Sequence, residues 1–198
     1  KKRNLKKYNL GNPKSFLTIK NIQTINGQKK ISFKIQNKNY LFKTSLIGKI
    51  QIKNLMFAIL AAYLSKLKIS DILKSIEKIK TINGRFEKVG KLKNKASVIL
   101  DYAHTPHALE TLIINIKEDF PLSKISLVFG CGGIRDKDKR SIMGKIAGKY
   151  CDTIYLTDDN PRTENPKLIR SQIKKGLKQK RFNEIPSRAK AIKTAIDQ

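Results

Sequence analysis

Apolar and polar residues largely alternate between residues 15 and 44, as expected for strands with one buried face. The alternation predicts three short strands, at Ser15–Lys20, Ile31–Gln36 and Tyr40–Thr44. Asn26-Gly27 and Asn37–Asn39 are typical turn sequences that would join them. Apolar side chains then recur at helical spacing and predict helices over residues 52–67 and 71–80, the second with Ser70 as its N-cap.

The second half of the chain alternates short apolar runs with amphipathic segments. The apolar runs predict strands at Ser97–Asp101, Ile125–Gly130 and Thr153–Thr157. The segments between and after them predict helices, at His104–Asp119, Ser141–Lys149, Pro166–Lys178 and Ser187–Asp197. Apolar strands separated by helices are typical of a parallel sheet covered on both faces. We therefore predict an α/β fold in which these strands form one mainly parallel sheet.

The acidic residues are unevenly distributed along the sequence. Residues 1–100 contain three acidic and 24 basic residues, whereas residues 101–198 contain twelve acidic and 19 basic residues. The change in composition predicts two structural units that meet near residues 84–95.

Clusters of polar residues follow each strand predicted in the second half, where ligands of parallel sheets bind. Gly130–Gly133 is either a phosphate-binding loop or only a tight turn, and Arg135 beyond it could bind a carboxylate. Asp159–Arg162 combines an acid, an amide and a guanidinium, which suits an amino acid, although a simple proline turn would also fit. Asp101, His104 and His107 are too few to favour a metal site.

Charge and cysteine content narrow the class of protein. The net charge of +28 comes from 35 Lys and only 8 Arg, and the Lys residues are scattered. Because Arg is the preferred residue for phosphate and base contacts, AT-biased codon usage explains the charge better than a nucleic-acid partner. A basic nucleic-acid-binding protein is the alternative, and salt would weaken its binding steeply. Cys131 and Cys151 predict free thiols in a reducing cytoplasm.

No stretch approaches the ~20 apolar residues that a membrane-spanning helix needs, so we predict no membrane partner. This observation excludes an integral membrane protein of the helical kind.

Five segments occur together in an order and spacing that resemble the Mur ligase family. They are GRFE at 84–87, DYAHTP at 101–106, FGCGG-x-RD at 129–136, KR at 139–140 and DNPR at 159–162. The resemblance runs from about Leu46 to the end of the chain. It is specific, because five separated motifs in register are very unlikely to arise by chance. DNPR is the signature of the family members that add meso-diaminopimelate.

The resemblance implies a three-domain enzyme of which this chain is an internal part. Residues 1–84 would be the later half of the α/β ATP-binding central domain. Residues 85–198 would be the Rossmann-like C-terminal domain, truncated at its end. The chain contains no G-x-x-x-x-G-K-[ST] segment, so we expect that loop, and the carbamylated lysine that assists magnesium binding, before Lys1. A G-K-G-H-E segment would follow Gln198.

The activity implied is ATP-dependent amide formation in the cytoplasm during peptidoglycan synthesis. ATP, with Mg²⁺, would convert the D-glutamyl carboxylate of UDP-N-acetylmuramoyl-L-alanyl-D-glutamate into an acyl phosphate, which the amine of meso-diaminopimelate attacks. The fragment alone should be inactive. A lysine-adding or polyglutamate-type ligase is the nearest alternative. DNPR argues against both, because a substrate without a second carboxylate has less use for Arg162.

Site residues carry over from the family motifs position by position, and none would be a covalent nucleophile. The residues expected at ATP are Asn54, Arg85, Asp101 and His104, with Arg85 neutralising phosphate charge. The residues expected at meso-diaminopimelate are Arg135, Asp159, Asn160, Pro161 and Arg162. Three positions depart from the usual family pattern: Ile50, Gln51 and Ile134.

Overall fold

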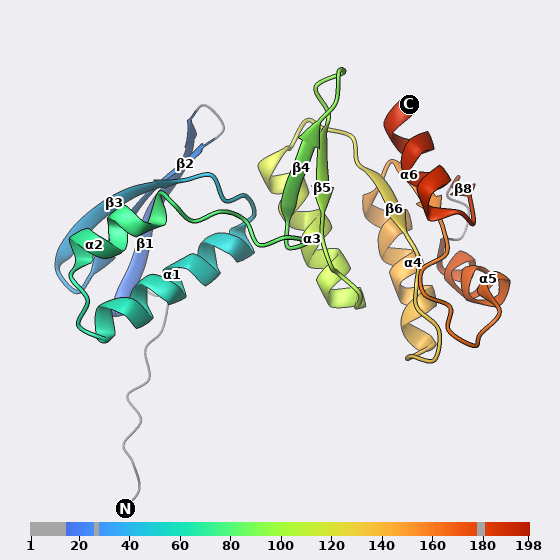
Figure 1. Cartoon of the computed structure of the whole chain (residues 1–198), viewed down its shortest axis with the longest axis horizontal. Helices are drawn as coiled ribbons and strands as arrows, with labels where there is room; N and C mark the ends of the chain where they lie inside the picture. The colour runs from blue at the N-terminus through green and yellow to red at the C-terminus, as the bar shows by residue number, and fades with distance from the viewer. Residues whose placement is uncertain (1–14, 26–27, 178–180) are drawn as a thin grey trace, which may run out of the picture. The chain divides into compact units, whose positions relative to one another are not determined.

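The computed structural model describes residues 15–25, 28–177 and 181–198. The chain divides into two compact units, Lys1–Lys88 and Val89–Gln198 (Figure 1). The predicted turn at Asn26-Gly27 and the predicted helix end at Lys178 lie outside the described residues.

Unit 1 consists of an antiparallel sheet and two helices. The strands, in sheet order, are β1 (Leu17–Ile25), β2 (Gln28–Ile35) and β3 (Lys38–Thr44). Ile31, Phe33 and Ile35 are buried along β2 while their neighbours are less buried, which confirms the predicted alternation. Met56 and Ile59 of the first helix complete the same hydrophobic core.

The helices of unit 1 are α1 (Lys49–Leu64) and α2 (Ile69–Ile76). The predicted N-cap at Ser70 is wrong, because α2 begins at Ile69, two residues earlier than predicted, and Lys68 occupies the cap position without a side-chain hydrogen bond. The Ser70 hydroxyl instead lies 3.4 Å from a carboxylate oxygen of Asp71.

Unit 2 alternates strands and helices as predicted. Its helices are α3 (Pro106–Asp119), α4 (Asp138–Tyr150), α5 (Pro166–Leu177) and α6 (Arg188–Asp197). The strands β6 (Ser126–Phe129), β7 (Thr153–Leu156) and β8 (Asn183–Glu184) form a parallel sheet in that order. The structure therefore confirms an α/β fold with a parallel sheet.

One predicted strand pairs differently from the expectation. Residues 97–101 were expected in the sheet of β6 and β7, but β5 (Ser97–Leu100) pairs with β4 (Glu87–Lys91) in a separate two-stranded sheet. A turn closed by a hydrogen bond from the Leu92 amide to the Ala96 carbonyl joins the two strands, at 2.8 Å. Because β5 is only half-buried, the apolar run Ser97–Leu100 belongs to a locally paired strand and not to a central one.

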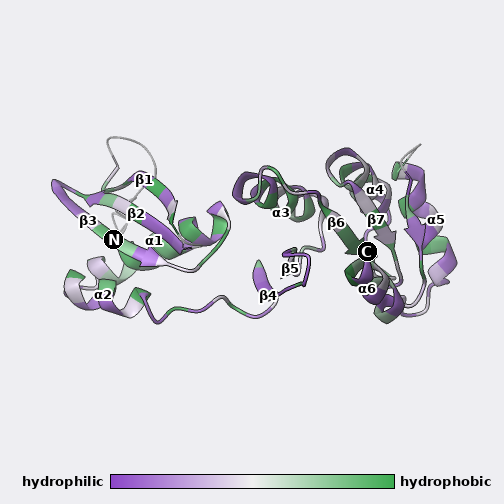
Figure 2. Ribbon diagram, turned by 90° about the horizontal axis from the view of Figure 1, so that it is seen from above, coloured by the Kyte–Doolittle hydropathy of each residue, from purple (hydrophilic) through white to green (hydrophobic). Residues whose placement is uncertain are grey.

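The core of unit 2 lies between the parallel sheet and its helices. Figure 2 shows apolar residues along β6 and mixed apolar and polar residues on the helices around it. Ile154 and Leu156 of β7 are fully buried, together with Ile173 of α5 and Ala147 of α4. No helix in the described part of the chain is long and apolar enough to cross a membrane.

Candidate functional site

The loops that follow β6 and β7 meet at the carboxyl edge of the parallel sheet. The amide of Gly133 donates to the carbonyl of Asn160 at 2.8 Å. The Arg162 guanidinium donates to the carbonyl of Gly133 at 2.6 Å, so the two loops exchange hydrogen bonds. The structure therefore brings together the segments 130–136 and 158–162, where the sequence placed the amino-acid site.

Glycines allow the close approach of these two loops. A Cβ atom on Gly130 would lie 2.2 Å from the carbonyl oxygen of Thr157, and one on Gly133 would lie 1.9 Å from that of Pro161. Such distances are far shorter than any van der Waals contact. Close packing of the two loops thus explains the glycines of the Gly130–Gly133 segment, and a phosphate-binding role for this segment stays a prediction.

The Asp159–Arg162 turn is shaped by its own polar side chains. An Asp159 carboxylate oxygen accepts from the Asn160 amide at 2.8 Å, and the Asn160 side-chain oxygen accepts from the Arg162 amide at 3.3 Å. Arg162 has a positive φ of 50°, while Pro161 is half-buried. The Asp159, Asn160 and Arg162 side chains remain exposed, so they are accessible to a ligand.

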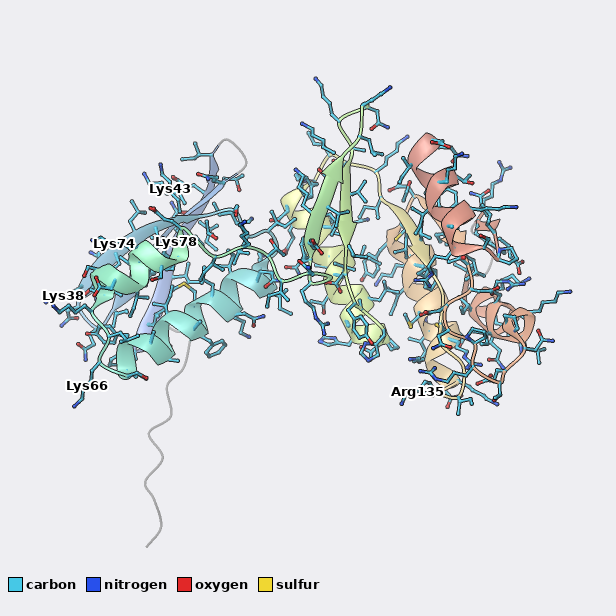
Figure 3. All side chains as sticks on the ribbon, in the orientation of Figure 1. Lys38, Lys43, Lys66, Lys74, Lys78 and Arg135 are labelled. Atoms are coloured by element: carbon cyan, nitrogen blue, oxygen red, sulfur yellow. The ribbon has the colours of Figure 1, made fainter. Side chains whose placement is uncertain are left out.

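Arg135 differs from Arg162 in its surroundings (labelled in Figure 3). Its side chain is exposed, and within the described parts of the chain it has no hydrogen bond or ion pair. A guanidinium in this state can bind a carboxylate through two parallel hydrogen bonds without first breaking a protein contact.

A buried ion pair beneath the two loops was not anticipated from the sequence. Arg140 of α4 is completely buried and donates to both oxygens of Glu164, at 2.8 and 2.9 Å. It also donates to the Gly132 carbonyl at 3.1 Å and to the Gln172 side chain at 2.6 Å. Arg140, Met143 and Ala147 share the buried face of α4, and this spacing was the available sequence signal.

The second partner of this pair, Glu164, contacts the first loop as well. One of its oxygens accepts from the amide of Ile134, a residue with a positive φ of 47°. The hydrogen bond from Arg140, and after it the Ile134 amide, lower the pKa of Glu164 from its usual value to about 2. Glu164 is therefore ionised throughout the physiological pH range.

A further charged cluster holds the start of the second loop. Arg170 of α5 pairs with Asp158 and, at 2.8 Å, with Glu184 of β8. Arg188 donates to the Asp158 carbonyl at 3.1 Å, and its guanidinium lies 3.8 Å from an Asp159 carboxylate oxygen. Asp158 is thus engaged within the protein, while Asp159 is the more accessible acid of the loop.

The segment that follows β5 contains two of the residues expected at ATP. A carboxylate oxygen of half-buried Asp101 accepts from the Ala103 amide at 2.8 Å. The side chain of His104 is exposed. The backbone carbonyl of His104 accepts a hydrogen bond from the ammonium group of Lys139 on α4, at 2.9 Å. Among the described residues, no group of three or more His, Cys, Asp or Glu side chains could hold a metal ion.

The other two residues expected at ATP lie in unit 1. Asn54 is exposed on α1, and Arg85 is exposed in the turn that precedes β4. The Gln51 side chain donates to the Arg85 carbonyl at 2.7 Å, which ties this turn to the first turns of α1. The ring of buried Phe86 packs closely against Gly48, because a Cβ on Gly48 would lie only 3.1 Å from it. That Asn54, Arg85, Asp101 and His104 share one nucleotide stays a prediction.

Cys131 and Cys151 are both buried and form no disulfide, as predicted. Burial raises the pKa of Cys131 to about 11. Its thiol lies 3.7 Å from the Met143 sulfur, so it packs as an apolar group within the glycine loop.

Comparisons with known proteins identify the family of this chain. A family model described as Mur ligase, glutamate ligase domain matches residues 84–198. A UDP-N-acetylmuramoyl-L-alanyl-D-glutamate–2,6-diaminopimelate ligase of Rickettsia conorii is 43% identical over 180 residues, which cover 89% of this chain and 37% of the relative. The solved structure of a ligase with the same name is 29% identical with a TM-score of 0.65, covering 96% of this chain and 39% of that one.

A folylpolyglutamate synthase of Thermotoga maritima shares the fold, with a TM-score of 0.72 and 23% identity over 90% of this chain and 41% of that one. The chain spans about a third of the length of the curated relatives it matches. Since the family match covers more than half of its residues, the chain belongs to the Mur ligase family.

Proposed function

We propose that this chain is part of a cytoplasmic, ATP-dependent ligase of peptidoglycan synthesis. The ligase joins meso-diaminopimelate to the D-glutamate of UDP-N-acetylmuramoyl-L-alanyl-D-glutamate. Residues 1–84 would belong to its ATP-binding central domain and residues 85–198 to its C-terminal domain. The names of the Rickettsia relatives support the assignment, and so does the DNPR sequence at 159–162.

The observation that carries this proposal is the pair of exposed arginines on adjacent loops. Arg135 follows β6 and Arg162 follows β7, and the Gly133 hydrogen bonds hold their loops together. Lysine and meso-diaminopimelate differ by one carboxylate at the far end of the side chain. A site that presents two guanidinium groups favours the amino acid with the extra carboxylate.

The remaining exposed groups of this loop suit the rest of the amino acid. Asp159 can accept from the ammonium group, while the Asn160 amide and the stiff Pro161 fix the shape of the turn. The reaction forms one amide bond between the amine nitrogen and the carboxyl carbon. These side chains therefore contribute orientation and charge stabilisation.

ATP, when bound with Mg²⁺, supplies the phosphoryl group that turns a carboxylate oxygen into a leaving group. In this proposal Arg85 neutralises phosphate charge, and Asn54, Asp101 and His104 contact the nucleotide. Asn54, Arg85 and His104 have exposed side chains, so they can reach a ligand. No magnesium ligand is assigned among the described residues.

The test is steady-state ligation by the complete gene product, with meso-diaminopimelate and with lysine. We expect Arg135→Ala to raise the KM for meso-diaminopimelate and to cut its kcat/KM by a factor that corresponds to about 2–4 kcal/mol. The preference over lysine should narrow, while the KM for ATP stays unchanged. Lys93→Ala is the matched control, because it removes one exposed positive charge from the turn between β4 and β5.

Three other outcomes would contradict the proposal. If the wild-type enzyme prefers lysine, it is the lysine-adding ligase. If it extends a polyglutamate chain, it is the polyglutamate-type ligase. An unchanged ratio of kcat/KM values in Arg135→Ala would mean that Arg135 does not select the substrate.

A further inference from the structure

We propose that Arg140 is a positioning residue for amino-acid selection in this ligase. Together with Glu164 it fixes the separation of the two loops that present Arg135 and Arg162. The inference rests on the function proposed above, but its structural part can be tested without any substrate.

The contacts of Arg140 reach both loops at once. Its guanidinium binds the two oxygens of Glu164, just after the second loop, and the carbonyl of Gly132 in the first loop. Glu164 in turn accepts from the amide of Ile134, one residue before Arg135. The pair therefore holds the first loop on both sides of Gly133, and Gly133 is the residue whose carbonyl binds Arg162.

Burial and charge exclude Arg140 itself as a substrate-binding cation. Its side chain has no exposed surface, and its charge is neutralised by a carboxylate held at two short distances. Among its nitrogens, only Nε lacks a partner within the described residues. The effect of Arg140 on a ligand must therefore pass through the two loops.

The geometry requires arginine and not merely a positive charge. A planar guanidinium can donate to Glu164, Gly132 and Gln172 together, because its donors point in fixed and different directions. A lysine ammonium is a single point that cannot span both Glu164 oxygens and the Gly132 carbonyl. Arg140→Lys should consequently preserve the ion pair while relaxing the position of the Gly130–Gly133 loop.

The experiment compares Arg140→Lys and Glu164→Gln with the wild type in the complete enzyme. We expect the KM for meso-diaminopimelate to rise about tenfold or more, because small misplacements of binding groups are costly. The preference over lysine should fall, and the KM for ATP should not change. Glu164→Gln keeps the shape of the side chain, but it removes the charge and replaces one of the two acceptor oxygens with a donor.

Amide hydrogen exchange of the complete enzyme gives a readout that needs no activity. The Gly133 amide, which donates to Asn160, should exchange faster in both variants than in the wild type. Leu177→Ala is the control for general destabilisation, because it removes a buried side chain at the opposite end of α5 from Glu164. That variant should lower the melting temperature without a selective change in the KM for meso-diaminopimelate.

The possible failures are distinguishable. If the wild type does not ligate meso-diaminopimelate, the proposed function is wrong, whereas the exchange of Gly133 still reports on the Arg140–Glu164 pair. If the enzyme is active but both variants keep its KM and its Gly133 exchange, the positioning role is refuted. A uniform rise in all KM values, as general loosening would produce, also refutes it.

Discussion

Arg135 and Arg162 carry the same charge, yet their guanidinium groups are in different states. Arg162 already donates to the Gly133 carbonyl, whereas Arg135 is exposed and makes no hydrogen bond or ion pair within the described residues. Replacing Arg162 therefore removes a loop contact as well as a charge. For this reason Arg135→Ala is the cleaner test of carboxylate recognition.

The pKa of Glu164 predicts how pH affects stability. Its pKa is lowered to about 2, so the folded protein holds this carboxylate ionised more strongly than the unfolded chain does. The stabilisation is fully present above the ordinary carboxyl pKa and is lost as the pH falls towards 2. We expect wild type to exceed Glu164→Gln in stability at neutral pH and the difference to shrink between pH 5 and pH 2, as measured by denaturant unfolding.

A difference between the two proteins that did not change over this pH range would show that Glu164 is not an important ion-pair partner of Arg140. Other carboxylates titrate in the same range in both proteins, so only the difference between the two unfolding curves is informative.

Sequence reasoning could find the segments of the site but not the state of each residue. The motifs placed Arg135 and Asp159–Arg162 correctly at strand ends, because strand periodicity and chain order are local properties. Arg140 ends a run of alternating charges that looks solvated. The burial of Arg140 depends on its ion pair with Glu164, which lies 24 residues further along the chain. No pattern in the residues around Arg140 indicates that partner.

At the level of elements, the site depends on how closely two loops can approach. Gly133→Ala would place a Cβ 1.9 Å from the Pro161 carbonyl oxygen, so the loops must separate. We expect a loss of about 1–3 kcal/mol in unfolding free energy, typical of overpacking, together with weaker binding of meso-diaminopimelate. Gly90→Ala on β4 is the matched control, because nothing lies within 4 Å of its Cβ position. Equal effects of both substitutions on stability would contradict this explanation.

The turn before β4 allows a corresponding test for the nucleotide. Gln51→Leu removes the hydrogen bond from α1 to the Arg85 carbonyl and should cost about 1 kcal/mol in stability. If Arg85 binds phosphate, the KM for ATP should rise while that for meso-diaminopimelate remains constant. Lys53→Leu makes a similar change at an exposed position of the same helix and should leave both KM values unchanged. An unchanged KM for ATP in Gln51→Leu would show that this turn does not position a nucleotide ligand.

The pairing of elements was less predictable than their existence. Helices α3 to α6 and strands β6 and β7 follow from the periodicity of the sequence. The partner of β5 could not be predicted in this way. A four-residue apolar run does not reveal whether its backbone hydrogen bonds are made with a central strand or with the nearby β4. The two-residue strand β8 is too short to leave a pattern.

At the scale of the whole molecule, each of the two units has its own hydrophobic core among the residues that the structure describes. Met56 in unit 1 and Ile173 in unit 2 are both completely buried. Each substitution to alanine should cost about 2–5 kcal/mol, the usual range for a cavity in a core. Hydrogen exchange should show faster opening mainly in the unit that carries the substitution. Equal acceleration in both units would mean that the chain unfolds as one cooperative body.

Most of the net positive charge lies in the first half of the chain, where residues 1–100 contain 24 basic and three acidic residues. In unit 1, the lysines labelled in Figure 3 come from several elements: Lys38 and Lys43 from β3, Lys74 from α2, and Lys66 and Lys78 from the segments after the helices. The codon-usage explanation of the charge stays a prediction, and the salt dependence of any binding to nucleic acid would test it.

The close contacts of the glycines limit which mutations the gene can accept. Besides the loop glycines, a Cβ on Gly144 would lie 2.2 Å from the Ile173 carbonyl oxygen, and one on Gly176 would lie 1.8 Å from that of Ser141. Every amino acid that a glycine codon can mutate to carries a Cβ. AT-biased codon usage can therefore change much of the surface, whereas a missense change at Gly144 or Gly176 would force α4 and α5 apart, and selection for a folded protein would act against it.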